Sequence, residues 1–352
     1  MTRVLLTGGA GFIGSHIVDH LIAQGHDVTV IDDLSGGFER NVNSQAEFVK
    51  GSINDVKLVD RIVKGKDIVF HLAAYAAEGL SHFIKKFNYE NNLIGSVNLI
   101  NAAVRENIEK FLFTSSMAVY GTNQTPFSED INPNPEDSYG VAKYATEKEL
   151  KISHELFGLK YVIIRPHNVY GERQNIGDHY RNVIGIFMNR IMKGLPPLIY
   201  GDGNQTRAFS YIDDVARAIA KAPFIKKAEG EIINVGAAKP YSINELAESV
   251  LKVSDSNIKP LYTPPRYEVK HAYCTIDKSV RLLDYKDTVT LDEGIGRMWN
   301  WARRIGPMPP TRIWVNLEIE KNLPPFWQTL KESGELGVDV VSVKPIERKK
   351  KK

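Results

Sequence analysis

The chain has 352 residues, enough for about two domains of ordinary size or for one large α/β unit. Hydrophobic residues make up 43% and charged residues 25%, so a mainly disordered chain, a collagen-like repeat and a membrane bundle are excluded. The net charge is +3, but the last five residues carry five positive charges, and subtracting them leaves −2 for the body of the chain. A near-neutral body lacks the basic surface of a dedicated nucleic-acid binder, so we expect no nucleic-acid partner.

Cys274 is the only cysteine, so no disulfide can form within the chain and a cysteine-based zinc site has too few thiolates. This fits a reducing compartment, and we expect a cytoplasmic protein. The apolar run at 4–6 is interrupted at once by Thr7 and Gly8, which makes it too short for a signal peptide. No uninterrupted apolar run reaches about 18 residues, so we also expect no transmembrane helix and no membrane partner.

The first half of the chain alternates short apolar runs with helix-length segments, the pattern of a parallel sheet covered by helices on both faces. Apolar spacing also predicts helices. Strands are expected at 3–6, 27–31, 47–49, 67–70, 110–113 and 161–164, and helices at 13–23, 91–106 and 141–155. The fold class is therefore α/β, with a Rossmann-type doubly wound parallel sheet.

Beyond residue 165 the pattern becomes irregular, and Pro and Gly residues mark loops between shorter elements. We expect a first domain at 1–165, rejoined by a strand near 231–235, and a smaller mixed α/β domain at 166–305. A C-terminal extension at 306–352 carries Trp314 and Trp327. It ends in a lysine run that we expect to be disordered.

A glycine-rich turn follows the first expected strand. The spacing of Gly8, Gly11 and Gly14 allows a tight turn, close backbone approach to a pyrophosphate, and close packing of helix on strand. The helix that follows would direct its N-terminus at the phosphates. Glycine spacing alone also fits an ordinary turn, but the position between a strand and a helix favours a dinucleotide site.

Two aspartates, Asp32 and Asp33, follow the second expected strand. A carboxylate there can accept hydrogen bonds from ribose hydroxyls and would repel a 2′-phosphate, so the predicted cofactor is NAD and not NADP. Asp32 is the better placed of the two. For Asp33 the more ordinary interpretation is a cap of the following turn.

Three polar residues form the candidate catalytic group. Ser116 follows the fifth expected strand, at the edge of the sheet where open α/β folds bind ligands. Tyr139 and Lys143 are four residues apart, so they share one helical face, and the ammonium can favour the ionised phenol. A phenol that normally titrates near 10 needs such help to accept a proton near neutral pH.

The sequence resembles the extended short-chain dehydrogenase/reductase family, and within it the NAD-dependent nucleotide-sugar epimerases similar to UDP-glucose 4-epimerase. The resemblance covers roughly residues 1–305. It rests on motifs in the family's order: TGGAGFIGS at 7–15, IDDLSGG at 31–37, HLAA at 71–74, SSMAVYG at 115–121, YGVAK at 139–143, RPHNVYG at 165–171 and GDGNQTRAFSYIDDVA at 201–216. By resemblance, residues 1–165 would bind NAD, residues 166–305 would bind a nucleotide-diphosphate sugar, and the chain would form a homodimer through helices at 91–106 and 139–157.

The resemblance also implies roles for individual residues. Ser116, Tyr139 and Lys143 would be catalytic. The cofactor contacts would come from Gly8, Gly11, Phe12, Ile13, Gly14, Asp32, Asp33, Ser52, Ile53, Leu72, Ala73, Ala74, Asn92, Ser115, Tyr139, Lys143 and His167. The substrate would be held by Ser116, Asn168, Arg207 and Arg266, with the two arginines as candidates for the diphosphate.

The chain departs from the family in two places. Ser52 stands where many relatives have an aspartate that binds the adenine amine. Arg266 is separated from Glu268 by one residue and not two. For Arg266, a surface ion pair is therefore a real alternative to diphosphate binding.

The residues after Ser116 bear on the reaction type. Dehydratases of the family carry Asp and Glu there and related decarboxylases a Glu, whereas this chain has Met117 and Ala118, which cannot transfer a proton. The resemblance therefore implies a 4-epimerase that works through a transient 4-keto sugar, with no metal. Decarboxylation, dehydration or reduction on the same scaffold and a non-catalytic NAD(H)-sensing protein are the alternatives.

The identities of the sugar and of the nucleotide stay open. Either Ala272 or Tyr273 could occupy the place where relatives tune tolerance of an N-acetyl group. Other residues could face the sugar or a uronate carboxylate: Tyr75, Glu78, His82, Arg173, His179 and Arg181.

Overall fold

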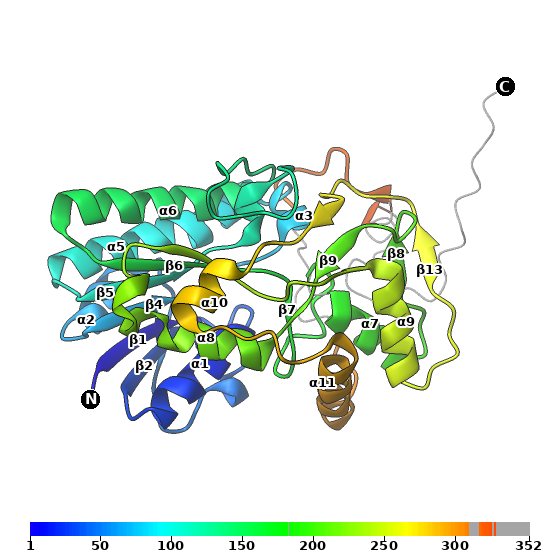
Figure 1. Ribbon diagram of the computed structural model, residues 1–352, viewed down its shortest axis with the longest axis horizontal. Helices are drawn as coiled ribbons and strands as arrows, with labels where there is room; N and C mark the ends of the chain where they lie inside the picture. Colours follow the sequence, from blue (N-terminus) through cyan, green and yellow to red (C-terminus); the bar gives the residue numbers. More distant parts are fainter. Residues whose placement is uncertain (182, 310–316, 326, 329–352) are drawn as a thin grey trace.

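A seven-stranded parallel sheet forms the centre of the protein, whose computed structural model describes residues 1–181, 183–309, 317–325 and 327–328 (Figure 1). The strand order is β11-β6-β5-β4-β1-β2-β3. The strands are β1 (Arg3–Thr7), β2 (Asp27–Asp32), β3 (Glu47–Lys50), β4 (Ile68–His71), β5 (Lys110–Thr114), β6 (Tyr161–Pro166) and β11 (Ile232–Val235). The strand order reverses between β1 and β4, and ligands of such sheets bind in the crevice at that point.

Helices cover both faces of this sheet. On one face α1 (Phe12–Ala23) packs beside α8 (Ile212–Lys221); on the other lie α2 (Val56–Val63), α5 (Gly95–Arg105) and α6 (Ser138–Phe157) (Figure 1). Successive strand side chains point to opposite faces. Val4 and Leu6 of β1 therefore join the core under α1, and Leu5 joins the core under α5.

The expected fold class is confirmed, and each of the six expected strands is found within two residues of its expected ends. The helix expected at 91–106 differs at its start. A short α4 (Lys85–Tyr89) leads through a π-helical turn, Glu90–Ile94, into α5. Asn91 and Asn92 lie in this turn, and such turns occur often at functional sites.

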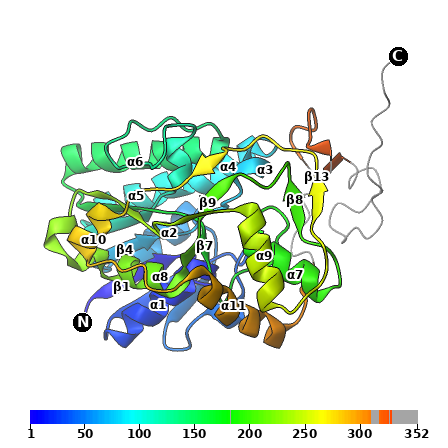
Figure 2. The same ribbon diagram turned by 45° about the vertical axis from the view of Figure 1, so that its right-hand side comes forward.

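A smaller unit lies beside the carboxyl ends of the sheet strands (Figure 2). Three helices pack together there: α7 (Val183–Met192), α9 (Ile243–Val253) and α11 (Leu291–Ile305). Three small sheets accompany them: β9 (Thr206–Ala208) with β12 (Pro240–Ser242) and β14 (His271–Ala272), β8 (Leu198–Tyr200) with β13 (Leu261–Thr263), and β7 (Val169–Tyr170) with β10 (Ser210–Tyr211).

The remaining named helices are α3 (Glu78–Ser81), which follows the loop after β4, and α10 (Asp277–Leu283). Over the described ranges, no helix is both long and apolar enough to cross a membrane. Trp314 and the lysine run that we expected to be disordered lie outside the described residues.

Candidate active site

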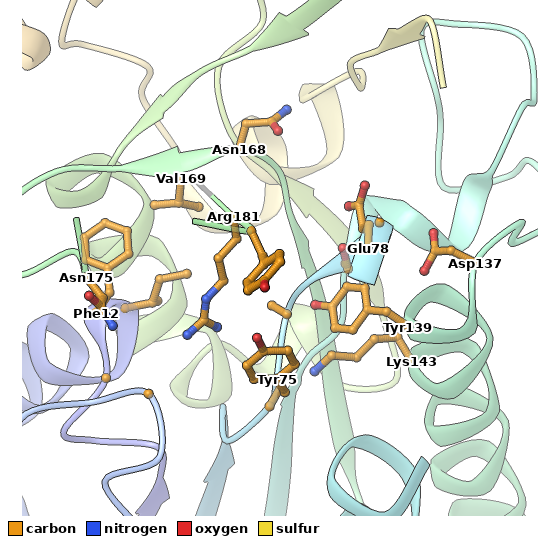
Figure 3. A pocket seen from close by; sticks show the side chains of 18 of the residues that line it. Phe12, Tyr75, Glu78, Asp137, Tyr139, Lys143, Asn168, Val169, Asn175 and Arg181 are labelled. Atoms are coloured by element: carbon orange, nitrogen blue, oxygen red, sulfur yellow. The ribbon is translucent and has the colours of Figure 1, made fainter. Parts of the chain in front are cut away.

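A cavity of about 510 Å³ lies between the carboxyl ends of the sheet strands and the smaller unit (Figure 3). It brings together most of the residues singled out from the sequence. These are Gly8, Gly11, Phe12, Ile13, Gly14, Asp32, Asp33, Ser52, Ile53, Leu72, Ala73, Ala74, Ser115, Ser116, Tyr139, Lys143, Asn168, Arg207 and Arg266.

Two of the proposed cofactor contacts, Asn92 and His167, do not line the cavity. The Asn92 amide accepts a hydrogen bond from the backbone N–H of Tyr75 at 2.8 Å and donates to the Tyr75 carbonyl at 3.0 Å. It therefore fixes the backbone of the loop after β4. His167 is buried, and its Nε2 is 2.9 Å from the carbonyl of Ala237. Their side chains hold the backbone that surrounds the cavity.

The glycine turn is shaped to receive a phosphate. Gly8 has φ +79°, and its N–H donates to the carbonyl of Ile31 at 2.8 Å. A Cβ on Gly14 would lie 2.2 Å from the Gly8 carbonyl oxygen, so only glycine fits there. The N-terminus of α1 follows and has no side-chain cap, which leaves N–H groups of its first turn available to an anion. This geometry fits the pyrophosphate of a dinucleotide.

Asp32 and Asp33 have different environments. The buried Asp32 carboxylate accepts hydrogen bonds from the N–H groups of Ala10 at 3.0 Å and Leu34 at 2.8 Å, and the N–H of Gly11 also bonds to it. A carboxylate has about four acceptor sites, so capacity for a ribose hydroxyl is left. Burial raises the pKa of Asp32 from the ordinary value. The exposed Asp33 accepts from the N–H of Ser35 at 2.7 Å, which is the turn-capping role considered for it.

A chain of buried hydrogen bonds fixes the loop after β4. The Thr7 hydroxyl accepts the N–H groups of Leu72 at 3.2 Å and Ala73 at 3.1 Å, which leaves its proton for His71 Nδ1 at 2.8 Å. His71 Nε2 can then donate to the Ser96 hydroxyl at 2.8 Å. Burial holds the pKa of His71 well below its usual value, so the ring stays neutral. A neutral ring can accept from Thr7 at Nδ1 and donate to Ser96 at Nε2.

Ser116, Tyr139 and Lys143 meet at the base of the cavity. The Ser116 side chain caps the short turn at 117–120 by accepting the N–H of Ala118 at 3.1 Å, and it also hydrogen-bonds the Tyr139 hydroxyl. The buried Lys143 Nζ donates to the Thr114 carbonyl at 2.8 Å and lies 5.8 Å from the centre of the Tyr139 ring. One helix, α6, positions both Tyr139 and Lys143 on a face directed at the cavity (Figure 3).

Burial controls the protonation of this group. It raises the pKa of Tyr139 above the ordinary value, and the nearby Glu78 carboxylate acts in the same direction. Burial also lowers the pKa of Lys143 to about 7. Before a ligand binds, Tyr139 is therefore a neutral phenol, and additional positive charge is needed at the site to make it a base.

Glu78 of α3 lies above Tyr139 and beside Asp137 (Figure 3). Its accessible surface faces the cavity, and protein surrounds the carboxyl group. The resulting loss of solvation raises the pKa of Glu78 to about 7, and the negative charge of Asp137 raises it further. Asp137 caps α6 by accepting the N–H of Gly140 at 2.8 Å. The sequence signal for this cap is an aspartate two residues before Tyr139, at the start of a helical apolar pattern.

Arg207 and Arg266 lie on the side of the cavity formed by the smaller unit, and one carboxylate, Glu268, pairs with both. Its Oε2 is 3.6 Å from Arg207 and 3.1 Å from Arg266. Arg207 also donates to the carbonyl of Val269 at 2.6 Å, which fixes its guanidinium, and Arg266 lies over the Tyr200 ring at 4.6 Å. Arg266 thus makes an ion pair and still lines the cavity, so the two interpretations offered for it are compatible.

Five of the six residues that could face the sugar or a uronate carboxylate lie at the cavity. Tyr75, Glu78, His82, His179 and Arg181 line the cavity. Arg181 lies over the Tyr75 ring at 5.1 Å and pairs with Asp178 at 2.7 Å.

Other candidates lie outside the cavity lining. Arg173 pairs with Asp19 at 2.7 Å. Neither Ala272 nor Tyr273 lines the cavity, and Ala272 instead packs in a small cluster with Met117 and Phe127. Because neither residue lines the cavity, their sizes do not indicate how much space surrounds the sugar.

The model of the NAD dependent epimerase/dehydratase family matches residues 4–236. The chain belongs to this family. A putative UDP-glucose 4-epimerase from Methanocaldococcus jannaschii is 40% identical over 304 residues, which cover 85% of this chain and 98% of that protein. A UDP-N-acetyl-alpha-D-glucosaminuronate decarboxylase from Bacillus cytotoxicus is 32% identical over an alignment that covers 86% of this chain and 98% of that protein.

The fold of a solved family member agrees with the structure. The crystal structure of UDP-glucose 4-epimerase with UDP-glucose from Thermotoga maritima has a TM-score of 0.83 and 35% identity, covering 86% of this chain and 99% of that one. The cofactor of this family is NAD, as expected from Asp32. The chain is thus an enzyme of the epimerase family, and its relatives act on different UDP-sugars.

Proposed function

We propose that the protein is an NAD-dependent 4-epimerase of a UDP-sugar. The observation that carries this proposal is the set of residues around Tyr139. Ser116 and Lys143 lie beside the phenol in a cavity that also contains the glycine turn, while the positions after Ser116 hold Met117 and Ala118. The site has the groups needed to oxidise and reduce a sugar alcohol but lacks a second acid–base pair at these two positions.

In the proposed reaction the Tyr139 phenolate removes the proton from the C4 hydroxyl of the sugar, and the same phenol returns it after the sugar has turned over. Ser116 donates a hydrogen bond to the reacting oxygen. Lys143 adds positive charge close to the phenol. Bound NAD would supply the hydride acceptor and donor at C4, and its positively charged ring would favour the phenolate.

The diphosphate is assigned to Arg207 and Arg266. Each guanidinium can form paired, charge-assisted hydrogen bonds with phosphate oxygens. Glu268, which pairs with both arginines, would hold them in place before the substrate arrives. The glycine turn and Asp32 would hold NAD in the part formed by residues 1–165, with residues 166–305 binding the nucleotide sugar.

A decarboxylase acting on a UDP-uronate is the second candidate. It is favoured by Arg181, a cavity-lining cation that could meet a carboxylate, and by the likeness to the Bacillus cytotoxicus enzyme. Met117 weighs against it, because related decarboxylases generally keep a glutamate near this position.

The Tyr139→Phe variant tests the proposed function. We expect NAD binding to be retained and epimerisation to fall by a factor of about 100 to 10,000, the range supplied by a positioned acid–base group. Substrates are UDP-glucose, UDP-N-acetylglucosamine and UDP-glucuronate, with C4 epimers followed by NMR. Tyr144→Phe, on the same helix but outside the cavity lining, is the matched control and should keep full activity. Substantial epimerisation by the Tyr139→Phe variant would contradict the assignment.

A further inference from the structure

The chain is longer than its relatives. The matches cover 98% and 99% of the related proteins but only 85% and 86% of this chain. About one seventh of the chain is therefore left over, which corresponds in length to the segment after α11. Within this segment, residues 317–325, 327 and 328 are described, and they lie near α3 (Figures 1 and 2). They also contact α4, and Trp327 lines the cavity.

Polar contacts fix the returning segment to α4. The Glu318 carboxylate accepts the N–H groups of Lys86 at 2.7 Å and Phe87 at 2.9 Å, which belong to the first turns of α4. The backbone N–H groups of Glu318 and Ile319 both donate to the carbonyl of Phe83, at 2.9 and 3.2 Å. α4 is the first turn of a helical segment that continues into α5, and an acidic side chain that accepts the N–H groups of this turn stabilises the helix end.

Apolar contacts bury the end of the segment. Trp327 is only 6% exposed, and its indole meets the Tyr180 ring edge-on at 5.1 Å and the Phe83 ring at 5.9 Å. Leu323 is buried in the same cluster, together with Leu80 of α3. Such aromatic pairs contribute beyond the area that they bury, so the segment is held by a specific aromatic arrangement.

This cluster forms part of the cavity wall. Trp327 lines the cavity, as do its partner Tyr180 and the neighbouring Tyr75. Tyr75 lies under Arg181 and faces Tyr139, where the proposed function places the sugar (Figure 3). The diphosphate arginines come from a different wall, in the smaller unit.

We propose that residues 317–325, 327 and 328 are a part of the substrate site that the aligned relatives lack, and that Trp327 is a specificity-determining residue at its sugar end. Its indole, supported by Tyr180, would pack against the apolar side of the sugar ring and limit the size of the group attached to it. The inference rests on the proposed function only in taking a UDP-sugar as the occupant.

The test compares three full-length variants: Trp327→Ala, Trp327→Phe and, as a matched control, Trp301→Ala on α11, which does not line the cavity. Titration calorimetry with UDP alone and with UDP-glucose, UDP-N-acetylglucosamine and UDP-glucuronate separates the two ends of the site. Trp327→Ala should leave UDP affinity within about twofold of wild type and weaken the best-bound UDP-sugar at least about fivefold, as expected for one lost aromatic contact. Trp327→Phe should restore much of the loss, and the control should show no selective effect.

Three results would overturn the inference: equal losses for UDP and UDP-sugar, no loss at all, or the same selective loss in Trp301→Ala. A protein that binds UDP but none of the UDP-sugars would also contradict it. These titrations need no turnover, so a selective loss supports the inference even where the epimerase assay fails. In active protein, the ratio of kcat/KM between two sugars should change in Trp327→Ala while NAD content stays constant.

Discussion

The charges around Tyr139 set the pH at which the phenol can lose its proton. Burial and the Glu78 carboxylate both raise its pKa, and the hydrogen bond from Ser116 lowers it. Glu78 itself has a pKa near 7, so it gains and loses its charge in the range where the enzyme would work. A carboxylate on α3 therefore influences the phenol on α6 through space, by its charge.

The Glu78→Gln variant tests this influence. It removes a negative charge that raises the pKa of Tyr139, so the pKa of the phenol should fall. The acidic limb of kcat/KM against pH should then move to lower pH by about one unit. Glu149→Gln, on the exposed surface of α6, is the control and should leave the profile unchanged. A limb that stays in place or moves to higher pH would show that Glu78 does not act on the phenol in this way.

At the scale of elements, the turn between β1 and α1 depends on the absence of a side chain at Gly14. Gly14→Ala would place a Cβ against the Gly8 carbonyl, 2.2 Å away, so the turn must shift. We expect NAD affinity to fall at least about tenfold, which corresponds to an overpacking cost within the usual range of 1–3 kcal/mol. Bound NAD is measured by its release from denatured protein and by titration.

Gly296→Ala on α11 is the matched control. A Cβ there meets no atom within 4 Å, and alanine favours a helix by roughly 0.5–1 kcal/mol relative to glycine. This variant should unfold at a slightly higher temperature and bind NAD normally. Unchanged NAD binding in Gly14→Ala would mean that the turn is not the pyrophosphate site.

The elements differ in how much of them the sequence predicts. β1 and β2 are visible because buried parallel strands need continuous apolar runs, and α6 because its apolar positions repeat at helical spacing. The glycine turn, Tyr139 and Lys143 are visible because their roles require particular residue types. The start of α5 is not visible in the sequence, because the π-helical turn contains Asn92, whose side chain bonds to the backbone of Tyr75 in the loop after β4.

Long-range contacts account for what the sequence does not predict at the site. Glu268 pairs with Arg207 only because β9 and β14 run side by side. Asn92, a predicted cofactor contact, does not line the cavity, and its side chain bonds to the backbone of Tyr75. The contribution of Trp327 requires the chain to return across the molecule after α11, and nothing in its local sequence indicates which surface it will meet.

At the scale of the whole molecule, the outer surface of α6 suggests how two copies would meet. Val141 and Ile152 lie three helical turns apart on one side of this helix and are 39% and 45% exposed. Ile94, at the start of α5, is 51% exposed. These apolar side chains fit the homodimer expected through α5 and α6, in which they would be covered.

Light scattering tests the dimer. The wild-type protein should have about twice the chain mass of 39.5 kDa, and Ile152→Glu should shift it towards the monomer, because a charge at an apolar interface lacks a partner. Val280→Glu, at an exposed apolar position on α10 away from these helices, is the control and should leave the mass unchanged. A monomeric wild-type protein would contradict the expectation.

In the proposed reaction a hydride leaves C4 of the sugar and returns to the same carbon within one binding event. It is tested most directly with the panel of UDP-sugars deuterated at C4 in ordinary water, followed by NMR. One of these sugars should be converted to its C4 epimer with the deuterium still at C4 in both epimers, and no reduced cofactor should accumulate. Loss of the label, accumulation of NADH or formation of a decarboxylated sugar would contradict it.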